Sequence, residues 1–184
     1  PVVQMDSVIG NKSGKVLLTM FSQNTNLLLA FLRDHNTARS VLDVFNDLYA
    51  MFGRETYCRL FPVILTDRGS EFSNPVPIEQ DENDELRSLV FYCNPSAPYQ
   101  KGGIEVAHEL VRRVLPKGKS FDDLQQEDID LMLSHINSYK RGKLNSRSAY
   151  QLFNFIYGDD ILPKLNIREI EANDIVLSPK LLKK

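Results

Sequence analysis

The sequence contains no tryptophan, two cysteines and three histidines, and its apolar residues form no long run. The longest apolar run, Leu27–Leu32, is far shorter than the roughly 18 residues that indicate a membrane span. Cys58 and Cys93 lack the close spacing of zinc ligands, and we expect buried free thiols of a reducing cytoplasm rather than a disulfide. The histidines, at positions 35, 108 and 135, also lack ligand spacing. These absences argue against a membrane-spanning protein, a zinc module and a disulfide-stabilised secreted domain.

A strong net charge is also absent, since 22 basic and 24 acidic residues leave a formal charge of −2. This balance is weak for a chain that holds a nucleic acid by itself, because phosphate backbones are bound through positive charge. The 184 residues, 42% of them apolar and 25% charged, suit one soluble domain with at most a small appendage. No signal peptide opens the chain, and the abrupt start on strand-like sequence at Pro1 is typical of a fragment of a longer protein.

The first 33 residues predict three short strands joined by turns. Apolar residues are frequent in Val2–Ile9, Val16–Phe21 and Leu27–Leu32. Polar turn residues separate these runs, at 11–14 and at 22–26. Closely spaced strands with such turns are typical of an antiparallel meander.

A helix and a buried strand are predicted next. Apolar residues recur at three- and four-residue spacing across residues 36–52, and we expect Gly53 to end that helix. The apolar run 61–66 has the length of a strand and leads directly into Asp67. A buried strand that follows a helix favours parallel pairing with the first strand. In that arrangement Asp67 can face Asp6, which lies in the first strand.

The rest of the chain predicts a polar connection, one more strand and several helices. Residues 73–86 carry an acidic cluster and are expected to form a solvated connection, followed by a short strand at 89–93. Residues 94–103 are rich in Pro, Gly and Ser, which predicts a mobile loop. Helices are expected at about 104–115, 121–139 and 146–157.

Two aspartates stand in distinctive local surroundings. Asp6 lies in an otherwise apolar strand, where an unpaired charge is costly unless a metal ion or a nearby base compensates it. The alternative is a strand-end or edge position that faces water. Asp67 precedes Arg-Gly, which is also an ordinary turn sequence. Carboxylates that converge from distant parts of a chain suit Mg²⁺, because this ion prefers hard oxygen ligands.

The predicted helix after Gly103 carries a third carboxylate. At 100° per residue its apolar residues form one stripe, made of Ile104, Ala107, Val111, Val114 and Leu115. Glu105 and Arg112 lie two turns apart on the adjoining face, with Glu109 beside them. This face is either part of a functional site or an ordinary solvated face with Glu–Arg pairs.

Four motifs follow one another in a recognisable order. Residues 5–10 read Met-Asp-Ser-Val-Ile-Gly, and residues 65–72 read Leu-Thr-Asp-Arg-Gly-Ser-Glu-Phe. Residues 94–113 contain Pro-Tyr-Gln-Lys-Gly, Ile-Glu and His-Glu-Leu-Val-Arg-Arg, and Leu-Pro-Lys-Gly follows at 115–118. Together they resemble the catalytic core of bacterial insertion-sequence (DDE-type) transposases, related to retroviral integrases in the ribonuclease-H-like superfamily. The resemblance covers about residues 2–157. We therefore expect residues 1–157 to form a catalytic core and residues 158–184 to form a C-terminal extension.

The resemblance implies a fold and a reaction. The implied fold is α/β, with helices on both faces of a mixed five-stranded sheet. The first three strands of this sheet are antiparallel. Asp6, Asp67 and Glu105 would be the catalytic residues and would ligate Mg²⁺ or Mn²⁺, as two ions. One ion would activate a water that cuts the DNA at a transposon end, and the freed 3′ hydroxyl would then attack target DNA. The implied setting is the bacterial cytoplasm, with DNA as partner and a homo-oligomer as the active complex.

The resemblance also implies contacts with DNA phosphates. Lys101, Arg112, Lys117 and Lys119 are the candidates, and ordinary surface charge is the alternative for each. His108 stands where superfamily members place a polar residue that supports the site.

The chain departs from the family pattern at three places, one of which is Ala149 where relatives commonly have a proline. Val3 and Gln4 stand where relatives usually carry a tryptophan and an acidic residue, and Val106 and Ala107 follow Glu105 where polar or basic residues are usual. Two rival functions follow. One is a ribonuclease-H-type nuclease without strand transfer. A joining assay on DNA with a free 3′ hydroxyl would distinguish it from a transposase. The other is a non-catalytic remnant that binds nucleic acid or dimerises, which the intact set of three carboxylates argues against.

Overall fold

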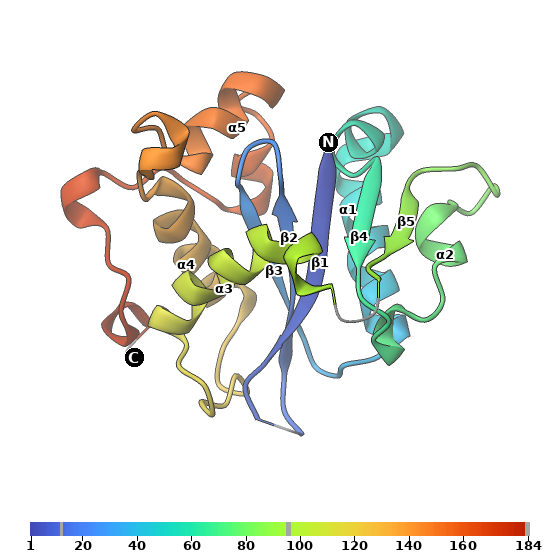
Figure 1. Cartoon of the computed structure of the whole chain (residues 1–184), viewed down its shortest axis with the longest axis horizontal. Coiled ribbons are helices and arrows are strands. Elements are labelled where there is room, and N and C mark those ends of the chain that lie inside the picture. The colour runs from blue at the N-terminus through green and yellow to red at the C-terminus, as the bar shows by residue number, and fades with distance from the viewer. Residues whose placement is uncertain (12, 95–96, 183–184) are drawn as a thin grey trace.

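A computed structural model describes residues 1–11, 13–94 and 97–182, and its centre is one mixed β-sheet (Figure 1). The strands are β1 (Val2–Ile9), β2 (Val16–Ser22), β3 (Leu28–Arg33), β4 (Val63–Thr66) and β5 (Leu89–Tyr92). Their order across the sheet is β3-β2-β1-β4-β5. β1, β2 and β3 pair antiparallel, whereas β4 pairs parallel with both β1 and β5. The predicted sheet, with its leading meander and its parallel fourth strand, is confirmed.

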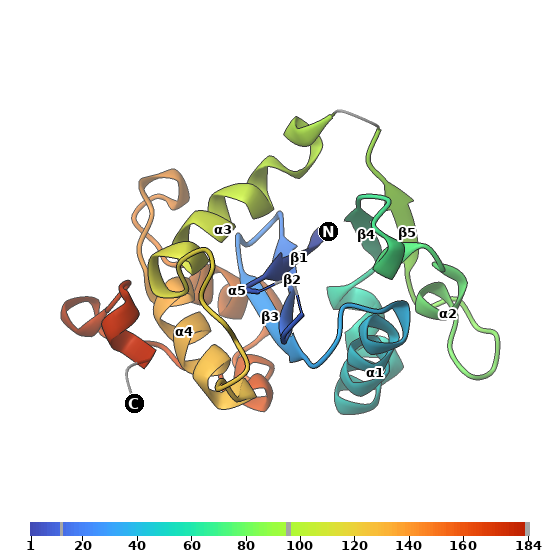
Figure 2. The same ribbon diagram turned by 90° about the horizontal axis from the view of Figure 1, so that it is seen from below.

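The helices are α1 (Ala38–Leu60), α2 (Val76–Glu79), α3 (Gly102–Val114), α4 (Gln126–Ser138) and α5 (Ala149–Tyr157). Figure 2 shows α3 on one side of the sheet and α1 on the other. α3 packs on β1 and β2, and α4 packs on β3. The expected covering of both sheet faces by helices is therefore present. None of the helices within the described ranges combines the length and the apolar character that a membrane crossing requires.

α1 differs from the predicted helix at its end. Thr37 caps its start, with Ser40 as the reciprocal partner in a capping box. Gly53 takes a non-helical backbone with φ of +71° and kinks the helix, as a stop signal should. The predicted helix therefore does end at Gly53, but a second helical stretch that was not predicted continues beyond the kink to Leu60. Tyr57 is fully buried in that stretch, so packing against the core holds it in place.

Three other segments also differ from the expectations. The polar connection 73–86 contains the short helix α2, whose Ile78 is buried. α4 begins at Gln126 rather than near 121, because Phe121 and Leu124 are buried in the turn before it. The expected loop 94–103 contains a 3₁₀ turn at Pro98–Lys101, and its residues 95 and 96 lie outside the described residues.

The outer edge of β3 is covered by side chains of α4. The amide of Asn137 donates to the Leu28 carbonyl (2.8 Å) and accepts from the Leu28 N–H (2.9 Å). Gln126 accepts from the Leu32 N–H at 2.8 Å and donates to the Ala30 carbonyl at 3.0 Å. Four backbone groups on the free edge of β3 are thus paired with side chains of α4.

Residues 158–182 run along the domain as short turns and extended segments. Their 3₁₀ turns are Leu162–Leu165, Ala172–Asp174 and Pro179–Leu182. Leu162, Ile167 and Leu182 are buried in the same apolar core as the sheet. The boundary at residue 157 between a core and an extension stays a prediction. Cys58 and Cys93 are free thiols, as expected, but each is only half-buried.

Candidate active site

The register of the sheet brings Asp6 and Asp67 to one place. The parallel ladder between β1 and β4 runs from Val2 opposite Val63 to Gln4 opposite Leu65. Asp6 and Asp67 each follow two residues after the last of these pairs. Because side chains two residues apart in a strand share a face, the register directs both carboxylates to the same side just beyond the end of β4.

Lys101 joins the two aspartates. Its Nζ atom lies 3.1 Å from Asp6 Oδ2 and 3.0 Å from Asp67 Oδ2. It also donates to the Met5 carbonyl at 3.4 Å. The Lys101 side chain is only 9% exposed, whereas those of Asp6 and Asp67 are 26% and 49% exposed. Burial disfavours the charged ammonium, but attraction by Asp6 and the hydrogen bond to Asp67 outweigh it and raise the pKa of Lys101.

Gln4 fixes the segment that carries Lys101. Its side-chain amide is buried, with 2% exposure for the residue. Nε2 donates to the Gln100 carbonyl at 3.0 Å, and Oε1 accepts from the Ile104 N–H at 2.7 Å. These two bonds flank Lys101 and satisfy an N–H of the first turn of α3, which has no partner within the helix. Gly103 allows the close approach, because a Cβ there would collide with Phe21 and Gln4.

His108 supports the backbone of Asp6 through Thr19. The Thr19 hydroxyl donates to the Asp6 carbonyl at 2.9 Å and lies 2.8 Å from His108 Nε2. Since the hydroxyl has one proton and gives it to Asp6, Nε2 of His108 carries a proton and donates to Thr19. Burial lowers the pKa of His108, although Asp6 opposes this shift. The neutral imidazole therefore acts as a structural donor beside the aspartates.

Glu105 stands apart from the two aspartates. It lies in the first turn of α3, one turn after Lys101, and is exposed. Across the described residues no group of three or more His, Cys, Asp or Glu side chains is arranged to hold a metal ion. The structure thus brings together Asp6 and Asp67 but not Glu105. Lys101 supplies one positive charge for the two aspartates, so a net negative charge remains there and disfavours the approach of a third carboxylate.

The residues at this point nevertheless fit a divalent metal. Two carboxylates from adjacent strands share one cation, and carboxylate oxygens are the ligands that Mg²⁺ and Mn²⁺ prefer. The Nζ atom of Lys101 stands in for that cation, at 3.1 and 3.0 Å from its two oxygen partners. The donor set is therefore chemically suited to the ions that the sequence predicted.

The other candidate DNA contacts lie along α3 and after it. Arg112 Nη2 donates to the Ile9 carbonyl at 3.0 Å, at the end of β1. Its Nη1 is buried without a hydrogen-bond partner, and burial lowers the pKa of Arg112. Lys117 and Lys119 are exposed. Contact of these residues with phosphate stays a prediction, as it does for Lys101, whose ammonium is engaged by the aspartates.

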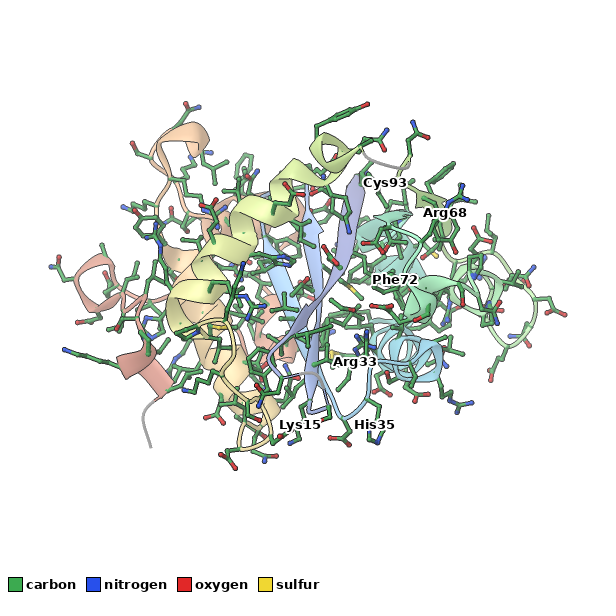
Figure 3. The ribbon with its side chains drawn as sticks, turned by 60° about the horizontal axis from the view of Figure 1, so that its bottom comes forward. Lys15, Arg33, His35, Arg68, Phe72 and Cys93 are labelled. Atoms are coloured by element: carbon green, nitrogen blue, oxygen red, sulfur yellow. The ribbon has the colours of Figure 1, made fainter. Side chains whose placement is uncertain are left out.

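A polar network beside Asp6 was not predicted. Arg33 Nη2 donates to Ser7 Oγ at 3.1 Å and to Asn36 Oδ1 at 2.9 Å. Asn36 in turn donates to Glu71 Oε1 at 3.0 Å. This chain of bonds ties β1 to the loop that carries Asp67. In Figure 3 the labelled Arg33 and Phe72 lie on the opposite side of β1 from α3.

Two signals in the sequence concern these supporting residues, and one is His108, which stands where the resemblance implies a supporting polar residue. Gln4 is a long polar residue inside the apolar run of β1, which marks a buried amide with partners elsewhere. Thr19 and Arg33 gave no such signal, because Thr is common in strands and Arg at strand ends.

The chain is similar in sequence and in fold to known integrases and transposases. No family model matches the sequence. The chain is 28% identical over 151 residues to a protein of a Spiroplasma virus named as an integrase, and 23% identical over 151 residues to the transposase of insertion sequence element IS4351 from Bacteroides fragilis. Each alignment covers 82% of this chain but only 45% and 44% of the relative. The chain thus spans less than half the length of these relatives.

Solved structures show the same fold. The catalytic core domain of BIV integrase matches with a TM-score of 0.55 and 21% identity, over 85% of this chain and 92% of that one. A chain of the simian T-cell lymphotropic virus intasome matches with a TM-score of 0.60 and 17% identity, over 92% of this chain and 58% of that one. The predicted ribonuclease-H-like fold is confirmed. Sequence and fold together identify the chain as a relative of the transposase and integrase catalytic cores.

Proposed function

We propose that this chain is the catalytic core of a metal-dependent DNA transposase or integrase. In this function it cleaves the ends of a mobile element and joins the 3′ hydroxyl to target DNA. The observation that carries the proposal is the convergence of Asp6 and Asp67, from adjacent parallel strands, on one cation only 3.1 and 3.0 Å away. Such a pair of carboxylates in this fold is suited to phosphoryl transfer.

Asp6, Asp67 and Glu105 are the proposed metal ligands. The exposed carboxylate of Glu105 lies one helical turn from Lys101, which itself reaches both aspartates. When bound, two divalent ions stabilise the attacking and the leaving oxygen of the phosphate. The proposal of two ions rests on the donor chemistry and on the similarity to transposases and integrases.

The remaining polar residues have supporting roles in this proposal. Gln4 positions the start of α3, and His108 with Thr19 holds the backbone of Asp6. Arg112, Lys117 and Lys119 are proposed to contact DNA phosphates, because they extend from the site along α3 and the turn after it.

The proposed partners are DNA and further copies of the chain, in a bacterial cytoplasm. Support for an oligomer comes from the similarity to a chain of an intasome.

A joining assay tests the function. A labelled DNA duplex with a free 3′ hydroxyl is incubated with a supercoiled plasmid, the protein and Mn²⁺. We expect transfer of the label to the plasmid by the unaltered chain, and none by the Asp67→Asn variant. This variant keeps the shape of the side chain and removes its charge. Asp159→Asn is the matched control, because Asp159 is an exposed aspartate at the end of α5, outside the site.

The outcome separates the possible functions. Nicking of the plasmid without label transfer would indicate a nuclease of the same fold. Absence of both reactions in the unaltered chain would indicate a non-catalytic remnant. Full label transfer by Asp67→Asn would contradict the role of Asp67.

A further inference from the structure

We propose that Lys101 is a built-in counter-ion of the aspartate pair, which a divalent metal ion must displace when it binds. This inference rests on the proposed function, since it assumes that Asp6 and Asp67 bind metal. It adds a step that the proposed function does not contain, namely an exchange between a cation of the chain and a cation from solution.

The first observation is the geometry of the ion pairs. Lys101 is the one cationic side chain within the described residues that forms ion pairs with Asp6 and Asp67, and it does so with both at once. The bonded oxygens, Oδ2 of each aspartate, are at 3.1 and 3.0 Å. A metal ion bound between the same oxygens would lie in the space of the ammonium and would repel it. Lys101 and a shared metal therefore exclude each other.

The second observation is the burial of Lys101. Its side chain is 9% exposed, which is unusual for lysine. A buried ammonium is retained only where its partners compensate the loss of water. Here the compensation comes from Asp6 and Asp67, with the Met5 carbonyl as a third acceptor. Once a metal ion neutralises the aspartates, that compensation is lost, and the ammonium is then more stable in solvent than in its buried position.

The third observation concerns the neighbours of Lys101 along the chain. Gln4 holds the Gln100 carbonyl and the Ile104 N–H, on either side of Lys101. The backbone is thus anchored while the Lys101 side chain is free to exchange. Glu105, directly after the second anchor, has a side chain without a hydrogen bond or ion pair among the described residues and is exposed. It is therefore available to turn inward when Lys101 turns outward.

Mn²⁺ binding, measured by isothermal titration calorimetry, tests the exchange without any need for catalysis. The variants are Lys101→Met and Lys101→Gln, which remove the competing charge. Lys180→Met is the control, because Lys180 is exposed in the C-terminal turn and its loss changes the net charge equally. We expect each Lys101 variant to bind Mn²⁺ about tenfold more tightly or better, the size of effect that one adjacent charge has on an ionisation equilibrium. The control should match the unaltered chain.

A fluorescence reporter provides a second measurement that keeps Lys101 in place. The sequence has no tryptophan, and Tyr99 is 78% exposed two residues before Lys101. A Tyr99→Trp variant therefore carries a single tryptophan next to the exchanging side chain. We expect its emission to change on saturation with Mg²⁺, and to change much less when Lys101→Gln is also present.

The outcomes separate this inference from the proposed function. If neither the unaltered chain nor any Lys101 variant binds Mn²⁺, the metal site itself is wrong and both proposals fail. If the unaltered chain binds Mn²⁺ and the Lys101 variants bind it equally or more weakly, the counter-ion proposal fails and the proposed function stands. If the Lys101 variants do not fold, an unchanged emission of Tyr99→Trp at saturating Mg²⁺ overturns the proposal, and a changed emission supports it.

Discussion

Replacing Gln4 by methionine should destabilise the domain through two lost hydrogen bonds. Methionine has nearly the same size and shape as glutamine, so the substitution leaves no large cavity. It removes the donor to the Gln100 carbonyl and the acceptor of the Ile104 N–H. The Gln100 carbonyl and the Ile104 N–H then lose the partner that Gln4 provides, and the buried methionine side chain next to them cannot replace it.

The magnitude follows from the number of groups left unpaired. A buried donor or acceptor that loses its partner costs about 1–3 kcal/mol. Two such groups give an upper estimate of about 2–6 kcal/mol. The gain from burying an apolar side chain in place of an amide offsets part of this cost. We therefore expect the free energy of unfolding to fall by about 2–3 kcal/mol in total.

Equilibrium unfolding in urea measures this loss. The control is Gln23→Met, because Gln23 is exposed in the turn after β2 and its substitution should change stability by no more than about 0.5 kcal/mol. Hydrogen exchange at the Ile104 amide gives a local readout, which should lose protection in Gln4→Met alone. A loss of stability equal to that of the control, with the Ile104 amide still protected, would refute the role given to Gln4.

Two further predictions concern pH and DNA. His135 accepts a hydrogen bond from the Val176 N–H through Nδ1 at 3.1 Å, and burial lowers its pKa in the folded chain. The unfolded chain therefore takes up the proton first, so this stability is present above a pH of about 6.5 and is lost as the pH falls towards the lower folded pKa. Urea unfolding at several pH values should show a steeper acid loss for the unaltered chain than for His135→Gln, and equal losses would contradict this. For DNA, a net charge of −2 predicts weak binding without sequence preference and with strong salt dependence, measured by anisotropy with terminal-repeat and scrambled duplexes at two salt concentrations. Tight, salt-resistant preference for the repeat would show that these residues carry a recognition function.

Much of the sheet could be predicted from the sequence because its signals are local. Closely spaced apolar runs with turn residues between them specify a meander, and an apolar run after a helix specifies a parallel strand. The parallel register then brings Asp6 and Asp67 together, which is why this half of the site was predictable. The second helical stretch of α1, beyond Gly53, was not predicted, because it is held by the burial of Tyr57 and Leu60 in the core.

The contacts of Lys101 could not be read from the sequence. The position of its ammonium depends on how the segment before α3 docks on β1, and that docking depends on Gln4, far away in the chain. On sequence grounds a lysine next to glycine in a loop is a surface charge. The separation of Glu105 from the aspartates also depends on this docking, because it places Lys101, one turn before Glu105, next to both carboxylates.

Diffraction from crystals soaked in Mn²⁺ shows directly whether Asp6 and Asp67 bind a metal ion in place of Lys101. Anomalous scattering locates the ion without any assumption about activity. We expect an anomalous peak between Asp6 and Asp67, with Lys101 Nζ moved away from both carboxylates and Glu105 turned towards the ion. A chain that takes up Mn²⁺ elsewhere, or that keeps Lys101 between the two aspartates at saturating Mn²⁺, would contradict this expectation.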